Sequence, residues 1–104
     1  MASTPEGKIQ LKILRYLREQ GHLFWRFSPE TYNAQLGRHI KHTYIPNGLS
    51  DIMVVHKRGF IMLEVKTPKG KPSADQILMK KRVERLGHEY HIVRSVEDVQ
   101  DLGL

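Results

Sequence analysis

The chain contains no cysteine. This absence excludes a disulfide framework, a zinc site with cysteine ligands and a cysteine nucleophile. Long apolar runs are also missing, and none approaches the roughly 20 residues that a membrane-spanning helix needs. The first eight residues, MASTPEGK, lack the apolar segment of a secretory signal. We therefore expect a cytosolic protein that makes no contact with a membrane.

The sequence is also too short for two ordinary domains. Its 104 residues fit one domain spanning residues 1–104, and 39% of them are hydrophobic. This proportion is enough for a modest core.

Acidic residues are few compared with basic ones. Asp and Glu total 11 against 17 Lys and Arg, which gives a net charge of +6 with histidine neutral. The basic residues are spread along the chain and are not gathered in a tail, so they predict a basic surface on a folded domain. Such a surface favours a polyanionic partner, and nucleic acid is the most common one.

Two segments near the start have clear periodicity. Thr4 and Pro5 predict the start of a helix, whose apolar residues recur at helical spacing until Gly21 ends it. The following segment, HLFWRFS, alternates as a strand and places Leu23, Trp25 and Phe27 on one face. We expect Trp25 and Phe27 to belong to the core. The alternative for the two aromatic residues is stacking on nucleic-acid bases.

Residues 29–48 show no period, and we interpret them as a long loop of functional use. After the two strands described next, Ser73 and Gln76 form a capping-box pattern that opens a helix ending at Gly87. A last strand, EYHIVR, precedes a short helix that Ser95 caps. The predicted order is helix, three strands, helix, strand, helix.

The segment SDIMVVHKRGFIMLEVKTPKG, residues 50–70, contains two apolar runs with acidic residues near one end. If Arg58-Gly59 forms a two-residue turn, Asp51 lies opposite Lys66. Because strand side chains alternate between faces, Asp51, Glu64 and Lys66 then share one face and one end of the hairpin. The other face is expected to be fully buried and comprises Ile52, Val54, Ile61, Leu63 and Val65.

Two carboxylates held close together repel each other, and a divalent cation relieves that repulsion. Carboxylate oxygens are hard ligands that suit Mg²⁺ or Mn²⁺. The alternative for Glu64 and Lys66 is a surface ion pair on an edge strand.

An acid followed by Glu64-Val65-Lys66, in this order of helices and strands, resembles the PD-(D/E)xK nuclease superfamily. The fuller pattern resembles the virus-type replication-repair nuclease (VRR-NUC) family. Four segments carry the likeness: EGKIQLKILRYLREQG (6–21), NGLSDIMV (47–54), FIMLEVKTPKGKPSADQ (60–76) and LGHEYHIVRSVED (86–98). Ser50 stands where the family motif usually has proline.

The resemblance implies an α/β fold with a restriction-endonuclease-like core, a small mixed sheet flanked by helices. It also implies that Asp51 and Glu64 bind Mg²⁺ or Mn²⁺, with help from the Val65 carbonyl and from Glu6. Glu6 has a second explanation, because an acid in the first helical turn is favourable to the helix dipole.

By the same resemblance, Lys66 would orient or activate the attacking water or stabilise charge on the phosphate. Gln76 would support the site, although its place in a capping box also explains it. In the long loop, we expect Arg38, His39 and Lys41 to contact DNA phosphates.

The function implied is a Mg²⁺- or Mn²⁺-dependent deoxyribonuclease, an endonuclease that hydrolyses DNA phosphodiesters. Small stand-alone domains of this kind resemble homodimeric Holliday-junction resolvases, with branched or four-way DNA as the partner. Two alternatives stay open: an endonuclease without junction preference, and a nucleic-acid-binding module whose acidic residues are inert.

Overall fold

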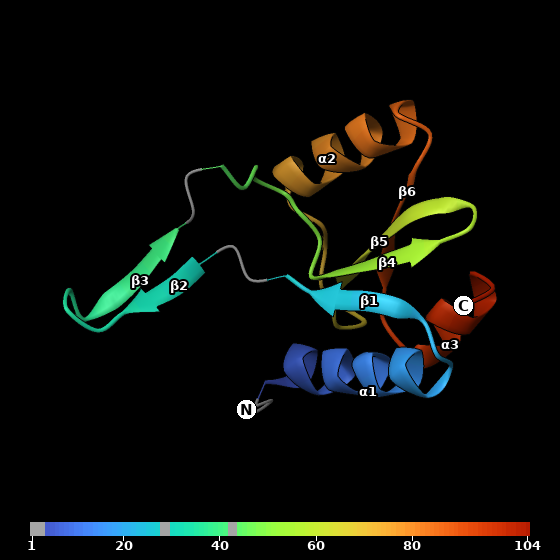
Figure 1. The fold of residues 1–104 in the computed structure, drawn as a ribbon, viewed down its shortest axis with the longest axis horizontal. Coiled ribbons are helices and arrows are strands. Elements are labelled where there is room, and N and C mark those ends of the chain that lie inside the picture. Colours follow the sequence, from blue (N-terminus) through green and yellow to red (C-terminus); the bar gives the residue numbers. More distant parts are fainter. Residues whose placement is uncertain (1–3, 28–29, 42–43) are drawn as a thin grey trace.

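The structure of the protein is a computed structural model, and it describes residues 4–27, 30–41 and 44–104. Three helices and six strands follow one another along this part of the chain (Figure 1). In order they are α1 (Pro5–Glu19), β1 (Leu23–Arg26), β2 (Glu30–Asn33), β3 (Arg38–Lys41), β4 (Ile52–His56), β5 (Gly59–Val65), α2 (Ala74–Arg85), β6 (Glu89–Val93) and α3 (Val96–Asp101).

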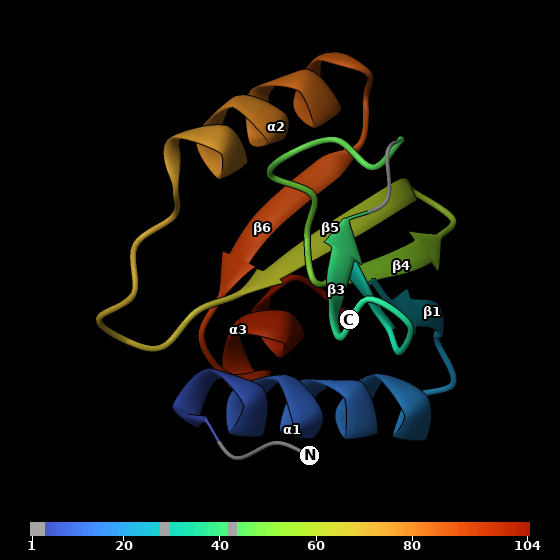
Figure 2. The same cartoon turned by 90° about the vertical axis from the view of Figure 1, so that its left-hand side faces the viewer.

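Four of the strands form one mixed sheet in the order β1-β4-β5-β6. The β1–β4 and β4–β5 pairs are antiparallel, whereas β5 and β6 are parallel. Helices α1 and α3 cover one face of this sheet, and α2 lies over the other face (Figure 2). The predicted α/β fold, a small mixed sheet flanked by helices, is therefore confirmed. None of the described helices is long and apolar enough to cross a membrane.

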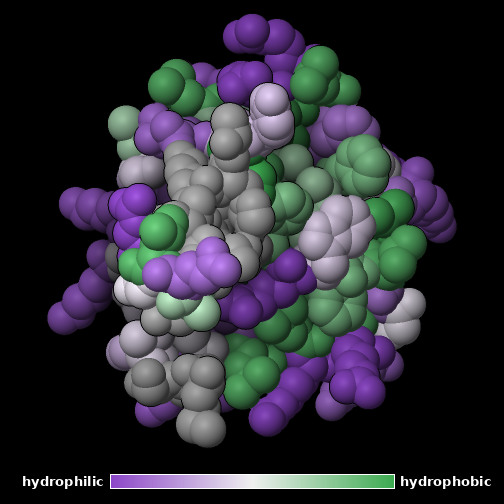
Figure 3. Space-filling view, turned by 60° about the vertical axis from the view of Figure 1, so that its left-hand side comes forward, coloured by the Kyte–Doolittle hydropathy of each residue, from purple (hydrophilic) through white to green (hydrophobic). Residues whose placement is uncertain are grey.

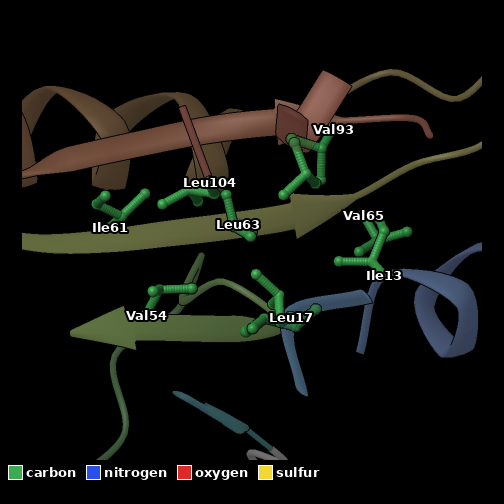
Figure 4. Packing of buried hydrophobic residues seen from close by; sticks show 10 residues of the cluster. Ile13, Leu17, Val54, Ile61, Leu63, Val65, Val93 and Leu104 are labelled. Atoms are coloured by element: carbon green, nitrogen blue, oxygen red, sulfur yellow. The ribbon is translucent and has the colours of Figure 1, made fainter. Parts of the chain in front are cut away.

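The first helix forms as its sequence predicts. The Thr4 hydroxyl accepts a hydrogen bond from the backbone N–H of Gly7 at 3.0 Å, which satisfies one of the free donors at the helix start. The apolar stripe of α1 faces the sheet, and Ile13 and Leu17 have no solvent exposure. They pack in the main core against inward residues of the sheet, of α3 and of the segment after α3, which are Ile52, Val54, Ile61, Leu63, Val65, Val93, Val99 and Leu104 (Figure 4).

A second, smaller cluster lies under α2. Met79 and Val83 of this helix pack with the fully buried Tyr90, and Met62 and Ile92 adjoin them. The capping box that opens α2 is present, because Ser73 and Gln76 exchange side-chain and backbone hydrogen bonds. Among the described elements, α2 contacts β6, and no contact with β1 or β4 accompanies it. The half of this face formed by β1 and β4 therefore has no described helix above it.

The interpretation of residues 29–48 as a loop is wrong for residues 30–41, whereas residues 44–48 contain no helix or strand and residues 29, 42 and 43 lie outside the described residues. Strands β2 and β3 pair as an antiparallel hairpin, with Asn33 opposite Arg38, and this hairpin projects from the rest of the fold (Figure 1). A hairpin that lies away from the core does not need an alternation of apolar and polar residues, so the periodicity that reveals the other strands is missing here.

The predicted turn of the β4–β5 hairpin is also displaced. His56 pairs with Gly59, so the two turn residues are Lys57 and Arg58, and Met53 lies opposite Met62. Gly59 is the first residue of β5, where φ is +119° and an added Cβ would lie 2.9 Å from Nδ1 of His88. The glycine is thus explained by the close approach of a side chain. The observed register differs from the predicted one by two residues. Because side chains alternate between the two faces, this difference leaves every side chain on its predicted face.

The prediction that Trp25 contributes to the core is wrong. Leu23 is 66% exposed and Trp25 is 42% exposed, whereas Phe24, between them, packs against the main core. Phe27 is half-buried. The alternation along β1 is present, but the side chains of Leu23 and Trp25 lie on the half of the sheet that α2 leaves uncovered.

Candidate active site

The register of three strands brings Asp51 next to Glu64. Ile52 pairs with Leu63 across β4 and β5, so one residue further along the same register Asp51 comes opposite Glu64. The backbone N–H of Val65 donates to Oδ2 of Asp51 at 2.9 Å. On the other side, the N–H of Phe27 donates to the backbone carbonyl of Asp51 at 2.7 Å. Asp51 is therefore held by both neighbouring strands.

A third carboxylate reaches the same point from α1. Glu6, in the first turn of that helix, joins Asp51 and Glu64, and one carboxylate oxygen from each residue lies within 4.8 Å of those of the other two. The three residues come from separate elements of the chain. A cluster of three acids drawn from a helix, from the residue before β4 and from β5 does not arise from local sequence, and only the tertiary fold brings it together.

The electrostatics of this cluster are unfavourable without a cation. Glu64 is only 3% exposed. Its pKa is raised from 4.5 to about 8, first by burial and then by the neighbouring charge of Asp51, while Lys66 acts in the opposite direction. Three carboxylates around one point form a hard-oxygen donor set, which fits a divalent cation such as Mg²⁺ or Mn²⁺.

Lys66 points toward the carboxylates. Its Nζ lies 3.6 Å from Oε2 of Glu64, and its side chain is 18% exposed. The backbone N–H of Lys66 donates to the carbonyl of Val93 at 3.0 Å, which ties this residue to β6. Since Glu64 is buried, the alternative of a solvated surface ion pair is wrong. The ammonium group therefore lies beside the carboxylate cluster.

The side-chain oxygen of Gln76 and the backbone N–H of Val65 both have hydrogen-bond partners. Oε1 of Gln76 accepts the N–H of Ser73 at 2.9 Å, so the side-chain oxygen is used by the capping box. The N–H of Val65 is used by Asp51. The side-chain amide of Gln76 and the carbonyl of Val65 stay predicted members of the site.

Two residues that support the site are not evident from the sequence. Gly48 has φ +84°, and an added Cβ would lie 2.2 Å from the backbone oxygen of Asp75 at the start of α2. The hydroxyl of Tyr90 donates to the carbonyl of Gly48 at 2.8 Å. Burial raises the pKa of Tyr90 above its ordinary value, and the charges of Glu64 and Asp51 add to that effect. The sequence carries the turn signal of Asn47-Gly48, but it does not reveal the contact with α2.

Arg94 supports the loop that follows β5. Its Nη1 donates to the carbonyls of Thr67 and Gly70 at 2.5 and 2.6 Å. This arginine therefore fixes the loop that directly follows Lys66. Nothing in the spacing of the sequence predicts this contact, because the partners are backbone atoms 27 and 24 residues away.

The predicted phosphate contacts fall on the hairpin and not on a loop. Arg38 begins β3 and is exposed, and the backbones of His39 and Lys41 continue the same strand. Figure 1 shows this hairpin on the side of the molecule where the N-terminal end of α1 also lies.

A solved structure described as a "VRR_NUC domain" superimposes on this chain with a TM-score of 0.71. The match covers 96% of this chain and 95% of the other, at 24% sequence identity. The chain has the fold of a VRR_NUC domain. No protein-family model matches the sequence, and no curated protein matches it either.

Proposed function

We propose that this protein is a metal-dependent DNA endonuclease that hydrolyses phosphodiester bonds. The observation that carries the proposal is the convergence of Glu6, Asp51 and Glu64 within 4.8 Å, with Nζ of Lys66 at 3.6 Å from Glu64. The VRR_NUC fold supports it, since that description names a nuclease domain.

Asp51 and Glu64 would hold Mg²⁺ or Mn²⁺, with Glu6 as a third carboxylate and the carbonyl of Val65 as a further oxygen. When bound, such an ion polarises a phosphodiester and lowers the pKa of coordinated water. Lys66 carries a positive charge and has no lone pair while protonated, so it cannot be a ligand in that state. Its role is to orient the attacking water or to stabilise the charge that develops on the phosphate. Gln76 would support the site from the start of α2.

The net charge of +6 suits a polyanionic substrate. Arg38, His39 and Lys41 would place basic groups on β3, on a hairpin that projects from the fold and can reach along a DNA strand.

We further propose that the substrate is branched DNA such as a four-way junction and that the active form is a homodimer. The described residues hold one cluster of three carboxylates, which supplies one cutting site per chain. Paired cuts across a junction need two sites, and a two-fold symmetric dimer would supply them.

The experiment is cleavage of labelled four-way junction, flap, duplex and single-stranded DNA with Mg²⁺, with Mn²⁺ and with EDTA. We expect cleavage with either metal, none with EDTA, and the highest rate on the junction. Binding of these DNAs without cleavage under any metal condition would instead support a nucleic-acid-binding module.

A further inference from the structure

The sheet face that α2 partly covers has no described helix over β1 and β4. This half of the face carries large apolar side chains. The outward residues of β1, β4 and the start of β5 lie on the same face as Tyr90, but α2 reaches only the β5–β6 half. Leu23 is 66% exposed, and Trp25 and Phe60 are each 42% exposed. Figure 3 shows hydrophobic side chains gathered on one side of the molecule, between the levels of α1 and α2.

This uncovered surface is continuous with the carboxylate cluster. The hydrogen bond from the N–H of Phe27 to the carbonyl of Asp51 places these two residues opposite each other, one residue beyond the last pair of β1 and β4. Trp25 pairs with Met53 in the same register, two residues further along each strand. Since strand side chains repeat every two residues, Phe27 and Trp25 share the face of Asp51. Trp25 is thus about 7 Å along the strand from the level of the cluster.

From this arrangement we propose that Trp25, with Phe27 beside it, is a stacking surface for unpaired bases of the DNA strand that is cut. The inference rests on the proposed function and deepens it, because it names the feature of the branched DNA that this surface would bind, which is unpaired nucleotides beside the scissile phosphate. Every base has a flat face, so stacking on aromatic rings binds unpaired nucleotides without sequence preference.

Three features favour DNA bases over a second copy of the chain as the occupant. The aromatic pair starts beside the acidic cluster, so a strand whose phosphate lies there must pass over or near it. A distance of about 7 Å corresponds to about two nucleotides at the rise of stacked DNA. The net charge of +6 attracts DNA, which is a polyanion.

The inference has a direct readout, because Trp25 is the one tryptophan in the sequence. Its fluorescence would be followed while the full chain is titrated with oligothymidylate, flap DNA and blunt duplex DNA in EDTA. We expect strong quenching by oligothymidylate and by the flap, and little quenching by the blunt duplex, whose bases are already stacked. Fluorescence anisotropy of labelled DNA would measure binding in parallel.

Matched variants separate stacking from general contact. Trp25→Ala should weaken binding of the flap by roughly 5- to 100-fold, in line with the loss of stacking on one base. Trp25→Phe should retain most of the affinity, because a ring remains. Leu23→Ala, on the same face but without a ring, should leave flap binding unchanged.

Several outcomes would overturn the inference. DNA that binds by anisotropy while Trp25 keeps its full emission would exclude stacking at this residue. A fluorescence change that depends on protein concentration without DNA, and that Leu23→Ala abolishes, would assign the surface to a second copy of the chain. If DNA quenches Trp25 but is not cleaved in Mg²⁺, the stacking surface stands and the proposed nuclease function is wrong. If DNA is cleaved while the emission of Trp25 stays unchanged, the nuclease function stands and the stacking surface is wrong.

Discussion

The backbone N–H of Val65 donates to Oδ2 of Asp51 at 2.9 Å, which ties the residue before β4 to the last residue of β5. Asp51 therefore has two separable roles: its oxygen accepts a hydrogen bond that fixes the strand ends, and its charge contributes to the cluster. Substitutions that keep or remove the acceptor can distinguish them.

We expect Asp51→Asn to fold with little loss of stability, because an amide oxygen can still accept the N–H of Val65. Asp51→Ala should lose about 1–3 kcal/mol in the free energy of unfolding, since that N–H is left without its partner. Both variants should lose tight Mn²⁺ binding. Denaturant unfolding and calorimetry would measure the two effects, and metal binding by Asp51→Asn equal to that of the parent would place the metal site elsewhere.

Glu64 predicts an unusual dependence of stability on pH. Its pKa in the folded state is about 8, above the ordinary 4.5, so the folded metal-free protein binds a proton that the unfolded chain has released. This contribution to stability is fully present below about pH 4.5 and is lost as the pH rises through 8. The metal-free melting temperature should therefore fall between about pH 5 and pH 8.

Glu64→Gln is the control for that pH dependence. The amide cannot ionise, so the variant should melt at a higher temperature than the parent at pH 8 and show a flatter profile over the same range. In the parent, Mn²⁺ affinity should increase with pH over this range, because the proton on Glu64 must leave before the metal binds. Identical pH profiles for the parent and Glu64→Gln would contradict the assignment.

The close contact between Gly48 and the start of α2 should make the stability of the protein sensitive to any side chain at position 48. Gly48→Ala should lose roughly 2–5 kcal/mol of stability, because the new Cβ adds a clash with the backbone of Asp75 to the strain of a positive φ. Gly21→Ala is the matched control, with φ +76° and nothing within 4 Å of the added Cβ. It should lose only about 1–2 kcal/mol. Equal losses in thermal melts would remove the clash with Asp75 from the explanation.

DNA binding should weaken steeply as salt increases, through release of counterions from the DNA. Replacing Arg38 and Lys41 by Ala should lower the affinity and reduce the salt slope by about one for each phosphate that the protein no longer neutralises. Mn²⁺ binding should not change, because neither residue belongs to the carboxylate cluster. Affinity that is independent of salt would argue against an electrostatic interface and against a DNA substrate.

The sequence predicts those parts of the fold that bury a periodic apolar face. The stripe containing Ile13 and Leu17, the apolar runs of β4 and β5, and the capping box of Ser73 all specify local structure by their own spacing. The face shared by Asp51 and Glu64 follows from alternation, and alternation survives the two-residue error in the hairpin register.

The remaining features depend on tertiary contacts that no local pattern encodes. A large aromatic residue such as Trp25 is usually buried, and only the position of α2 shows that its half of the sheet is uncovered. The β2–β3 hairpin has no core to face, so it has no apolar period. Gly59 resembles a turn residue in the sequence, whereas its close neighbour in space is the ring of His88, from the segment before β6.

The measurement that tests the account most directly is single-turnover cleavage of DNA by the parent and by Lys66→Ala at saturating protein and Mg²⁺. Lys66 lies 3.6 Å from Glu64, but it is not a ligand while protonated, so the variant should fold, bind Mn²⁺ and bind DNA as the parent does. Its cleavage rate should fall by about 10²-fold or more, as when a fixed electrostatic donor is removed. Lys69→Ala, which removes an exposed lysine from the neighbouring loop, should cut at the parental rate. A Lys66→Ala variant that melts normally and cuts as fast as the parent would contradict the assignment of this site to phosphodiester hydrolysis.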